Sequence, residues 1–257
     1  GDGMAEPRTV RIAAVGDIHV TKSSQGSLQS VLAPLDGAAD VLLLCGDLTD
    51  YGLREETAVL VRELQAVRIP IVAVLGNHDY ESGRPEDVRG PLCDAGVRVL
   101  DGEACELLGV GFAGVKGFCG GFGRGTLGAW GERAIKNFVQ ESLDEAMKLE
   151  SALARLRTPR KVAVLHYSPV QSTVEGEPPE IFPFLGTSRL EGPLNRYPVD
   201  AVFHGHAHRG SPEGQTVGGT PVYNVALPLL RRVNAASGRS PVRIVELPVE
   251  LPDDAAA

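Results

Sequence analysis

The sequence predicts an α/β protein built around a largely buried sheet. Two observations support this class. Short apolar runs rich in β-branched residues alternate along the chain with segments whose apolar residues recur every three or four positions. A length of 257 residues is also sufficient for one large domain that buries its own core. Since neither a linker nor an internal repeat interrupts the pattern, residues 1–257 are expected to form a single domain.

The first half of the chain predicts three strands and two helices. Ser27 is the expected N-cap of the first helix, because its hydroxyl can accept a hydrogen bond from a free amide of the first turn. In chain order, the expected elements are a strand at 10–15, a helix from about 27 to 35, a strand at 41–45, a helix near 54–67 and a strand at 69–75. Shorter strand-like runs follow near 97–100, 106–108 and 110–113.

The second half begins with a change of character. Nine glycines fall between Gly109 and Gly128, which indicates a mobile surface loop rather than a regular element. An amphipathic helix is expected at about 132–156, and the loop and helix together, about 114–157, could act as a lid. Further strands are expected at 162–165, 199–203, 222–225 and 242–247, and the tail at 250–257 has nothing to bury and is expected to be disordered.

Charge and composition exclude several classes of protein. Lys and Arg total 25 against 33 Asp and Glu, and a net charge of −8 argues against extended nucleic-acid binding. The apolar runs are too short to cross a bilayer, so no membrane association is expected. The N-terminal segment lacks a secretory pattern, and the four cysteines form no C-x-x-C pair. These features favour a cytoplasmic protein, and they leave a homo-oligomer open.

The chemistry lies where the predicted strands end. Each of five strands is followed directly by a short cluster of carboxylate, amide or imidazole side chains. Open α/β sheets build their binding sites at the carboxyl ends of strands, so these clusters are expected to meet. Asp, Asn and His suit a hard or borderline divalent metal, and no cysteine belongs to the set. The candidate ligands are Asp17, His19, Asp47, Asn77, His166, His206 and His208.

Seven ligands are too many for one zinc-like ion and suit two ions that share a carboxylate. Asp47 is the natural bridge, because it is single and central in the order of the clusters. Two divalent ions about 4 Å apart would clamp a phosphate and lower the pKa of a bridging water, which makes hydroxide available near neutral pH. Mn, Fe, Zn, Mg and Ni all accept such mixed ligands.

The motifs D-x-H, G-D, G-N-H-D, H and G-H-x-H, found between Asp17 and His208, resemble those of the calcineurin-like metallophosphoesterase family. The resemblance implies a four-layer αββα sandwich with mixed sheets and two metal ions. It implies that one ion binds Asp17, His19, Asp47 and His208, and that the other binds Asp47, Asn77, His166 and His206. His78 matches the family's catalytic histidine, which protonates the leaving oxygen, and Asp79 matches the partner that orients this histidine.

Differences between these motifs and those of individual branches of the family limit the class of reaction expected. The segment after Asp47 lacks the arginine that is typical of Ser/Thr protein phosphatases. Purple acid phosphatases have a tyrosine ligand three residues after the bridging aspartate, and this chain has Asp50 there. The motifs most resemble those of small cyclic-nucleotide-phosphodiesterase-like enzymes. The expected function is therefore hydrolysis of a small nucleotide-like or other organic phosphodiester. A phosphomonoesterase or a compact nuclease is the alternative, and a binding scaffold that lost catalysis is a third.

Four further features have weaker assignments. Lys116 and Arg189 are candidates to contact a second phosphate or a base of the substrate. His204 matches no ligand of the family, so a role in packing or in supporting a ligand is expected rather than direct chemistry. The G-x-G-x-x-G pattern at 109–114 fits a dinucleotide site only formally, because no helix opens after it.

Overall fold

The computed structural model describes residues 8–250, which form two sheets packed face to face. The tail at 250–257 was expected to be disordered. Except for residue 250, these residues lie outside the described range. The first sheet has the strand order β11-β1-β2-β3-β4. Its strands are β1 (Arg8–Val15), β2 (Val41–Cys45), β3 (Ile71–Val74), β4 (Arg98–Val99) and β11 (Arg243–Val249).

The second sheet has the order β5-β6-β7-β8-β10-β9. Its strands are β5 (Glu103–Leu107), β6 (Val110–Gly114), β7 (Arg160–Val164), β8 (Ala201–His204), β9 (Glu213–Gln215) and β10 (Pro221–Asn224). Both sheets are mixed. β1 to β4 are parallel with β11 antiparallel, and β6, β7, β8 and β10 are parallel with β5 and β9 antiparallel at the edges.

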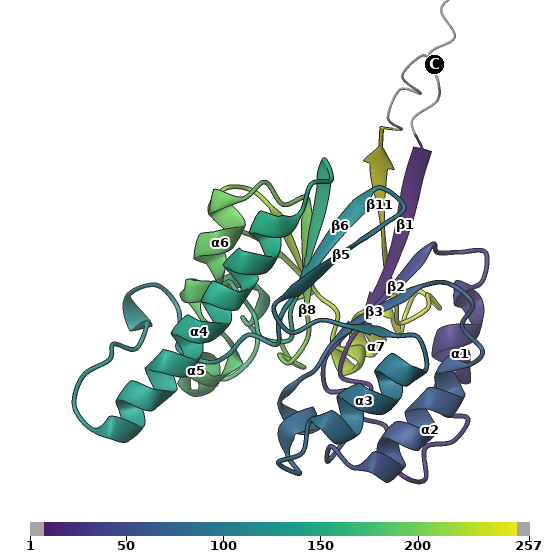
Figure 1. Ribbon diagram of the computed structural model, residues 1–257, viewed down its shortest axis with the longest axis horizontal. Coiled ribbons are helices and arrows are strands. Elements are labelled where there is room, and N and C mark those ends of the chain that lie inside the picture. Colours follow the sequence, from purple (N-terminus) through teal and green to yellow (C-terminus); the bar gives the residue numbers. More distant parts are fainter. Residues whose placement is uncertain (1–7, 251–257) are drawn as a thin grey trace, which may run out of the picture.

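Helices cover the outer faces of both sheets. α1 (Gln29–Leu32), α2 (Arg54–Leu64) and α3 (Glu86–Asp94) pack on the first sheet, and α4 (Arg133–Arg155) and α6 (Glu191–Arg196) pack on the second (Figure 1). Two short helices, α5 (Phe182–Leu185) and α7 (Leu227–Asn234), complete the set. The expected αββα sandwich is therefore confirmed.

The core between the sheets explains why the strands are apolar throughout. Residues such as Ile12, Leu43 and Phe112 are fully buried between the two sheets. Their neighbours in sequence, such as Ala13 and Leu42, face the helices instead and are equally buried. Because both faces of each sheet are covered, the strands read as continuous apolar runs instead of alternating ones.

Most expected elements form within a few residues of their expected bounds. The strand expected at 41–45 is confirmed at both ends, and the long helix expected at 132–156 corresponds to α4. The helix expected at 27–35 is shorter than expected. Its first residue is Gln29, it ends at Leu32, and a 3-10 turn at Ala33–Leu35 follows. Ser27 is not its N-cap, because Leu28 occupies that position and no side chain caps the helix.

The expectation of a surface loop in the glycine-rich stretch is wrong for most of its length. Residues 110–114 form β6, and residues 115–122 are buried apart from the half-buried Phe118. Here glycine permits close packing. A Cβ at Gly120 would lie 2.9 Å from the Thr187 hydroxyl oxygen, and one at Gly121 would lie 2.6 Å from the carbonyl oxygen of Gly125. The stretch becomes exposed only from Gly123 onward.

No helix within residues 8–250 is both long enough and apolar enough to cross a membrane.

Candidate metal centre

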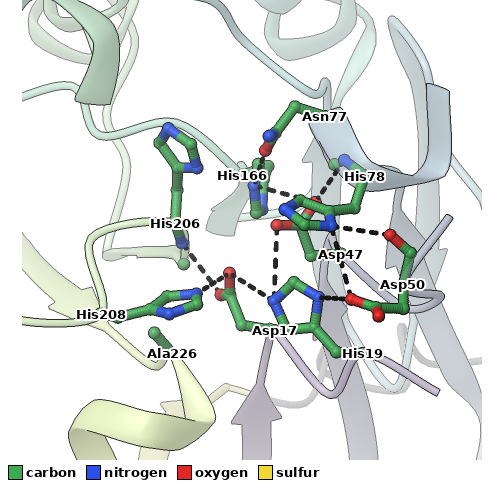
Figure 2. Close-up of polar contacts among 12 residues, drawn as sticks. Asp17, His19, Asp47, Asp50, Asn77, His78, His166, His206, His208 and Ala226 are labelled. Carbon is green, nitrogen blue, oxygen red and sulfur yellow. Dashed lines mark hydrogen bonds and ion pairs between the residues drawn. The ribbon is translucent and has the colours of Figure 1, made fainter. Parts of the chain in front are cut away.

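The predicted ligands converge at one edge of the sandwich. β1, β2 and β3 of the first sheet are followed by Asp17, Asp47 and Asn77, and β7 of the second sheet is followed by His166. His206 and His208 follow β8. The donor atoms of the predicted ligands form two groups, each with all its donors within 4.8 Å of one another (Figure 2). The first group is Asp17, His19, Asp47 and His208, and the second is Asp47, His166 and His206. A third group of the same compactness joins His19 to Asp50 and His78, which are not predicted ligands.

Left-handed backbone conformations turn these side chains inward. Asp17, His19, Asp47 and His206 have φ values of 54°, 43°, 51° and 72°. Non-glycine residues rarely adopt positive φ, and such strain persists only where the surroundings enforce it. Backbone hydrogen bonds supply that support, from the Asp17 amide to the Gly46 carbonyl at 2.9 Å and from the His19 amide to the Asp47 carbonyl at 3.0 Å. The strand ends are thus shaped to present these side chains together.

The first group is organised around the carboxylate of Asp17. His208 Nε2 lies 2.9 Å from Asp17 Oδ1, and the His206 amide donates to Asp17 Oδ2 at 2.9 Å. His19 Nε2 lies 3.9 Å from Asp17 Oδ1 and 3.7 Å from Asp47 Oδ2. These separations leave room for an ion between the imidazole and the carboxylates.

The second group shares Asp47 with the first. His166 Nε2 lies 3.3 Å from Asp47 Oδ1 and 2.9 Å from Asn77 Oδ1, so the amide of Asn77 also belongs to this group. Asp47 presents Oδ2 to His19 and Oδ1 to His166. Its two carboxylate oxygens therefore face the two groups separately, which is the arrangement expected of a bridging ligand.

Two imidazoles are oriented by backbone carbonyls. His166 Nδ1 lies 2.8 Å from the Cys45 carbonyl oxygen, and His206 Nε2 lies 2.9 Å from the Phe184 carbonyl oxygen. A nitrogen that donates to a carbonyl must carry the proton, so the other nitrogen of the same ring holds the free lone pair. His166 Nε2 and His206 Nδ1 are then the atoms available to a metal.

Burial and charge act on the pKa values of this cluster in opposite directions. Burial lowers the pKa of His206 to about 4, which keeps the ring neutral and able to coordinate. Burial would also lower the pKa of His166, but the nearby carboxylates of Asp47 and Asp17 outweigh it and raise that pKa to about 9. Burial opposes ionisation of Asp47, yet the His166 imidazolium and two hydrogen bonds hold its pKa well below the usual range. A divalent cation would replace that proton as the partner of Asp47.

These residues fit a bound divalent cation. Both ring nitrogens of His19 are buried and have no hydrogen-bond partner among the described residues, although Asp50 Oδ1 lies 3.3 Å from Nδ1. A buried polar atom without a partner is costly, and a bound cation would satisfy it. The glycines around the ligands also leave no room for a side chain. A Cβ at Gly205 would lie 2.1 Å from Asp17 Oδ2, and one at Gly76 would lie 2.3 Å from Asp47 Oδ1.

His78 lies beside the first group, next to His19. The ring centroids of His78 and His19 are 4.5 Å apart, and the His78 amide donates to Asp47 Oδ1 at 2.9 Å. His78 Nδ1 lies 2.8 Å from the Asp50 carbonyl oxygen and 3.6 Å from Asp50 Oδ1. The side chain of His78 is 41% exposed, so its ring is accessible from solvent.

The expectation that Asp79 orients His78 is not met, because Asp50 holds that ring. The Asp79 carboxylate turns away into the protein, where it is fully buried and accepts hydrogen bonds from the amides of Leu48, Thr49 and Gly76 and from the Thr49 hydroxyl. Burial and the Asp47 charge raise the pKa of Asp79 to about 6. Asp79 therefore connects the loops after β2 and β3. The residue that faces His78 and His19 is Asp50, which no sequence motif identified as functional. Its position three residues after Asp47 was the one available signal.

Lys116 and Arg189 are not among the converging donors. Lys116 is buried, with 8% exposure, and its ammonium contacts the Gly117 carbonyl at 2.6 Å and Glu145 Oε1 at 3.2 Å. Arg189 donates through Nη2 to the Leu127 carbonyl, and burial lowers its pKa. Lys116 is thus engaged by the protein itself, whereas Arg189 is engaged only through Nη2, and its buried Nη1 has no hydrogen-bond partner among the described residues.

His204 lies inside the protein, as expected for a role in packing or support. It is fully buried, with Nε2 2.7 Å from the Thr173 hydroxyl oxygen and Nδ1 2.7 Å from the Gly205 carbonyl oxygen. Burial lowers its pKa to about 4, so the ring stays neutral. The glycine pattern at 109–114 is not a dinucleotide site, because Gly109 belongs to the turn between β5 and β6 and residues 110–114 form β6, with no helix opening there.

An αββα sandwich that collects carboxylate and imidazole donors at the strand ends defines a metallophosphoesterase fold with a candidate metal centre. A model of the calcineurin-like phosphoesterase family matches residues 10–210, and the chain belongs to this family. Among curated protein sequences, none matches this chain significantly.

Solved structures share the fold at low sequence identity. One matches with a TM-score of 0.59 at 15% identity, over 95% of this chain and 100% of its own. The protein TT1561 of Thermus thermophilus matches with a TM-score of 0.54 at 17% identity, over 95% of this chain and 100% of its own. A provisionally assigned 5'-nucleotidase from Staphylococcus aureus, solved in complex with alpha-ketoglutarate, matches with a TM-score of 0.52 at 16% identity, over 84% of this chain and 48% of its own.

Proposed function

We propose that this protein hydrolyses phosphodiesters of small nucleotide-like or other organic phosphates in a metal-dependent reaction. One observation supports the proposal most strongly. Two groups of metal-binding donors share the carboxylate of Asp47, and the solvent-accessible ring of His78 lies beside them. This arrangement brings a phosphate-binding centre and a proton donor to the same surface, which is what hydrolysis of a phosphate ester needs.

The seven predicted ligands would hold two divalent cations, with Asp47 between them. Carboxylate, amide and imidazole donors suit Mn, Fe, Zn, Mg or Ni. When bound, the ions supply Lewis-acid activation of the phosphate and of the attacking water. The carbonyls of Cys45 and Phe184 keep His166 and His206 in one tautomer and one orientation. The site is therefore largely formed in advance.

His78 is the proposed general acid. In its protonated form, Nδ1–H would stay on the Asp50 carbonyl oxygen, 2.8 Å away, and Nε2–H would be free for transfer to the leaving oxygen. The Asp50 carboxylate, 3.6 Å from Nδ1, would stabilise the positive charge of that protonated ring. Asp79 has no direct part in this step and instead supports the loops that carry Asp47 and Asn77.

A metal-by-substrate matrix tests the proposal. Metal-free protein is supplied in turn with Mn, Fe, Zn, Mg and Ni and assayed with bis(p-nitrophenyl) phosphate, p-nitrophenyl phosphate and cyclic nucleotides. We expect hydrolysis of diesters with at least one metal and its loss in Asp47→Asn, because the shared ligand is removed. Hydrolysis of the monoester alone would support a phosphomonoesterase instead. If no ester is hydrolysed with any metal, the protein is not a phosphoesterase.

A cytoplasmic location is also proposed. It is supported by the four cysteines, which are all free thiols, since a reducing compartment keeps thiols unpaired. Fractionation of cells that express the full-length protein tests it.

A further inference from the structure

A buried asparagine lies against the loop that carries the predicted ligands His206 and His208. Asn224 is the last residue of β10, and it is fully buried. In the second sheet it pairs with His204, the last residue of β8, so the two side chains lie on the same face at neighbouring strand ends. A buried amide is stable only when its donors and its acceptor are hydrogen-bonded, so the partners of Asn224 show which segments it holds.

Both donors and the acceptor oxygen of the Asn224 amide have partners. Nδ2 donates to the Ala207 carbonyl at 2.8 Å and to the Thr173 carbonyl at 3.1 Å, and Oδ1 accepts from the Ala226 amide at 3.2 Å. The reversed orientation would place Oδ1 against two carbonyl oxygens and would lose these bonds. Space is also restricted, because a Cβ at Gly210 would lie 2.9 Å from Nδ2. The amide is therefore fixed in one orientation.

One of these bonds fixes the peptide between the two predicted ligands. Ala207 separates His206 from His208, so its carbonyl belongs to the peptide that leads into His208. The loop is not regular secondary structure. His206 has a φ of 72°, and two hydrogen bonds span only two residues, from the Ala207 amide to the Gly205 carbonyl at 2.8 Å and from the His208 amide to the His206 carbonyl at 3.0 Å. Such a conformation persists only where the surroundings enforce it, and the Asn224 amide is part of that support.

The acceptor oxygen of the same amide holds the segment beside Asp17. Ala226, which donates to Oδ1, pairs with Gly16, the residue before Asp17. The residues on both sides of Ala226 hydrogen-bond to the amide and the carbonyl of Gly16, at 2.9 Å each. Figure 2 shows Ala226 beside Asp17 and His208. Asn224 thus connects the loop of His208, which follows a strand of the second sheet, with the end of β1 in the first sheet.

His204 and Thr173 complete this support. His204 Nδ1 lies 2.7 Å from the Gly205 carbonyl oxygen, so Nδ1 carries the proton, and Nε2 accepts from the Thr173 hydroxyl at 2.7 Å. The carbonyls on both sides of His206, those of Gly205 and Ala207, are therefore each held by a buried side chain. A buried polar network in which each member has its partners favours a single arrangement of the backbone around it.

We propose that Asn224 is a positioning residue of the metal centre, which sets the place of His208 relative to Asp17 and thereby the affinity of this group for a divalent cation. The inference rests on the proposed function for the assignment of these two side chains as ligands. His208 Nε2 lies 2.9 Å from Asp17 Oδ1, although the two residues follow strands of different sheets. Their separation therefore depends on a group that holds both segments, and the Asn224 amide does so.

Binding of Mn²⁺ tests the proposal without any turnover. Asn224→Asp keeps the shape of the side chain but places an oxygen where Nδ2 faces two carbonyls. Calorimetric titration of the metal-free protein at pH 7 is expected to give about 10- to 100-fold weaker binding at one or more sites, the usual effect of removing a partner that supports a metal ligand. The visible spectrum of the Co²⁺-loaded variant, which reports coordination geometry, should also differ from that of the wild type.

A second variant keeps the test valid if Asn224→Asp does not fold. Asn224→Ser retains one hydroxyl donor, which can serve only one of the two carbonyls at a time. It should weaken Mn²⁺ binding severalfold, less than Asn224→Asp does. Binding of Mn²⁺ to Asn224→Ser with the wild-type affinity would contradict the positioning role.

Two controls separate positioning from a general loss of stability. Asn195→Asp makes the same chemical change at an exposed amide, whose Oδ1 accepts from the Gly218 amide at 3.3 Å, and it should leave Mn²⁺ affinity unchanged. Leu35→Ala removes a buried core side chain close to the start of β2, whereas the predicted ligands follow the ends of the strands. It should lower the thermal midpoint, because it leaves a cavity, but keep the affinity at the wild-type level.

The outcomes distinguish this inference from the proposed function. Wild-type Mn²⁺ affinity and an unchanged Co²⁺ spectrum in Asn224→Asp would overturn the inference and leave the proposed hydrolysis untouched. An equal loss of affinity in Leu35→Ala would also overturn it, since the effect would then follow stability alone, as would a wild-type protein that binds neither ion. Weaker binding in Asn224→Asp, without hydrolysis of any ester by the wild-type protein, would support the positioning role and contradict the proposed function.

Discussion

The ring of His78 is held by Asp50. Its Nδ1 lies 2.8 Å from the Asp50 carbonyl oxygen and 3.6 Å from one oxygen of the Asp50 carboxylate, which also lies 3.3 Å from His19 Nδ1 (Figure 2). Asp50 thus connects the proposed acid with a predicted metal ligand. The neighbouring Asp79 has a structural task instead, and this division of roles leads to two contrasting predictions.

Replacement of His78 should separate catalysis from metal binding. We expect His78→Ala to lower kcat for a diester by about 10²- to 10⁴-fold, because a positioned general acid contributes about that much. The bound metal should remain close to the wild-type amount, since no predicted ligand is removed. Elemental analysis of dialysed protein, together with turnover measurements, checks this. A variant that loses its metals would show that His78 is a ligand.

Replacement of Asp79 should mainly affect folding. Asp79→Ala removes the acceptor of four hydrogen bonds in a fully buried position, and the donors are left unpaired. We expect the free energy of unfolding to fall by about 3 kcal/mol or more, as measured by denaturant titration. The exposed Asp36 offers a control, and Asp36→Ala should change stability by less than about 0.5 kcal/mol. A fully stable Asp79→Ala protein would contradict the assigned role.

Replacement of Gly205 should disrupt the metal centre without removing any ligand. A Cβ at this position would lie 2.1 Å from Asp17 Oδ2, so Gly205→Ala must displace the Asp17 carboxylate. We expect weaker metal binding and a loss of about 1–3 kcal/mol in stability from the forced shift. Gly125→Ala is the control, because nothing lies within 4 Å of a Cβ there. Unchanged metal content in Gly205→Ala would place Asp17 outside the coordination sphere.

The buried thiol of Cys119 should make stability depend on pH at the alkaline side. Burial raises the pKa of Cys119 to about 11 from an ordinary value of 9.0. Between these values the unfolded chain releases a proton that the folded protein keeps, so stability is complete below about pH 9 and declines as pH rises towards 11. The expected loss is about 2–3 kcal/mol.

Denaturant titrations from pH 8 to 11 check this, with Cys119→Ala as the comparison. The difference between the two proteins isolates the thiol, because the other titrating groups are common to both. The exposed Cys93 provides an internal control for thiol reactivity. Because it is exposed, Cys93 should react with a thiol reagent under conditions in which the buried Cys119 is protected. Identical pH profiles of the wild-type protein and Cys119→Ala would contradict the prediction.

Local sequence patterns were sufficient for the strands and for the candidate ligands. The run at Val41–Cys45 is apolar throughout because both faces of the sheet are covered, and it forms β2 with the expected bounds. Asp17 and Asp47 each follow their strand after a single glycine, so a strand prediction also predicts their place at the sheet edge. The side chains expected around Asp47 lie close together in the structure, and their role as metal ligands stays a prediction.

Patterns that depend on long-range packing were less informative. The glycines after β6 suggested a loop on the surface, yet residues 115–122 are largely buried because those glycines allow backbone segments to approach closely. Lys116 looked free to meet a phosphate, but it contacts Glu145, which lies 29 positions farther along the chain (145 − 116) on α4. No local pattern reports such a contact.

The family, the αββα fold and the seven side chains that could bind metal were all predictable from the chain alone, because each depends on residues close together in sequence or on a recurring motif. Two relationships emerged only from the folded molecule: Asp50 rather than Asp79 holds His78, and the main-chain carbonyl of Phe184 in α5 orients His206. The physical reason is the same in both cases. Two adjacent loops, or a helix and a distant loop, meet only when the sheets pack, and the side chain that fills the space between them is selected by that packing.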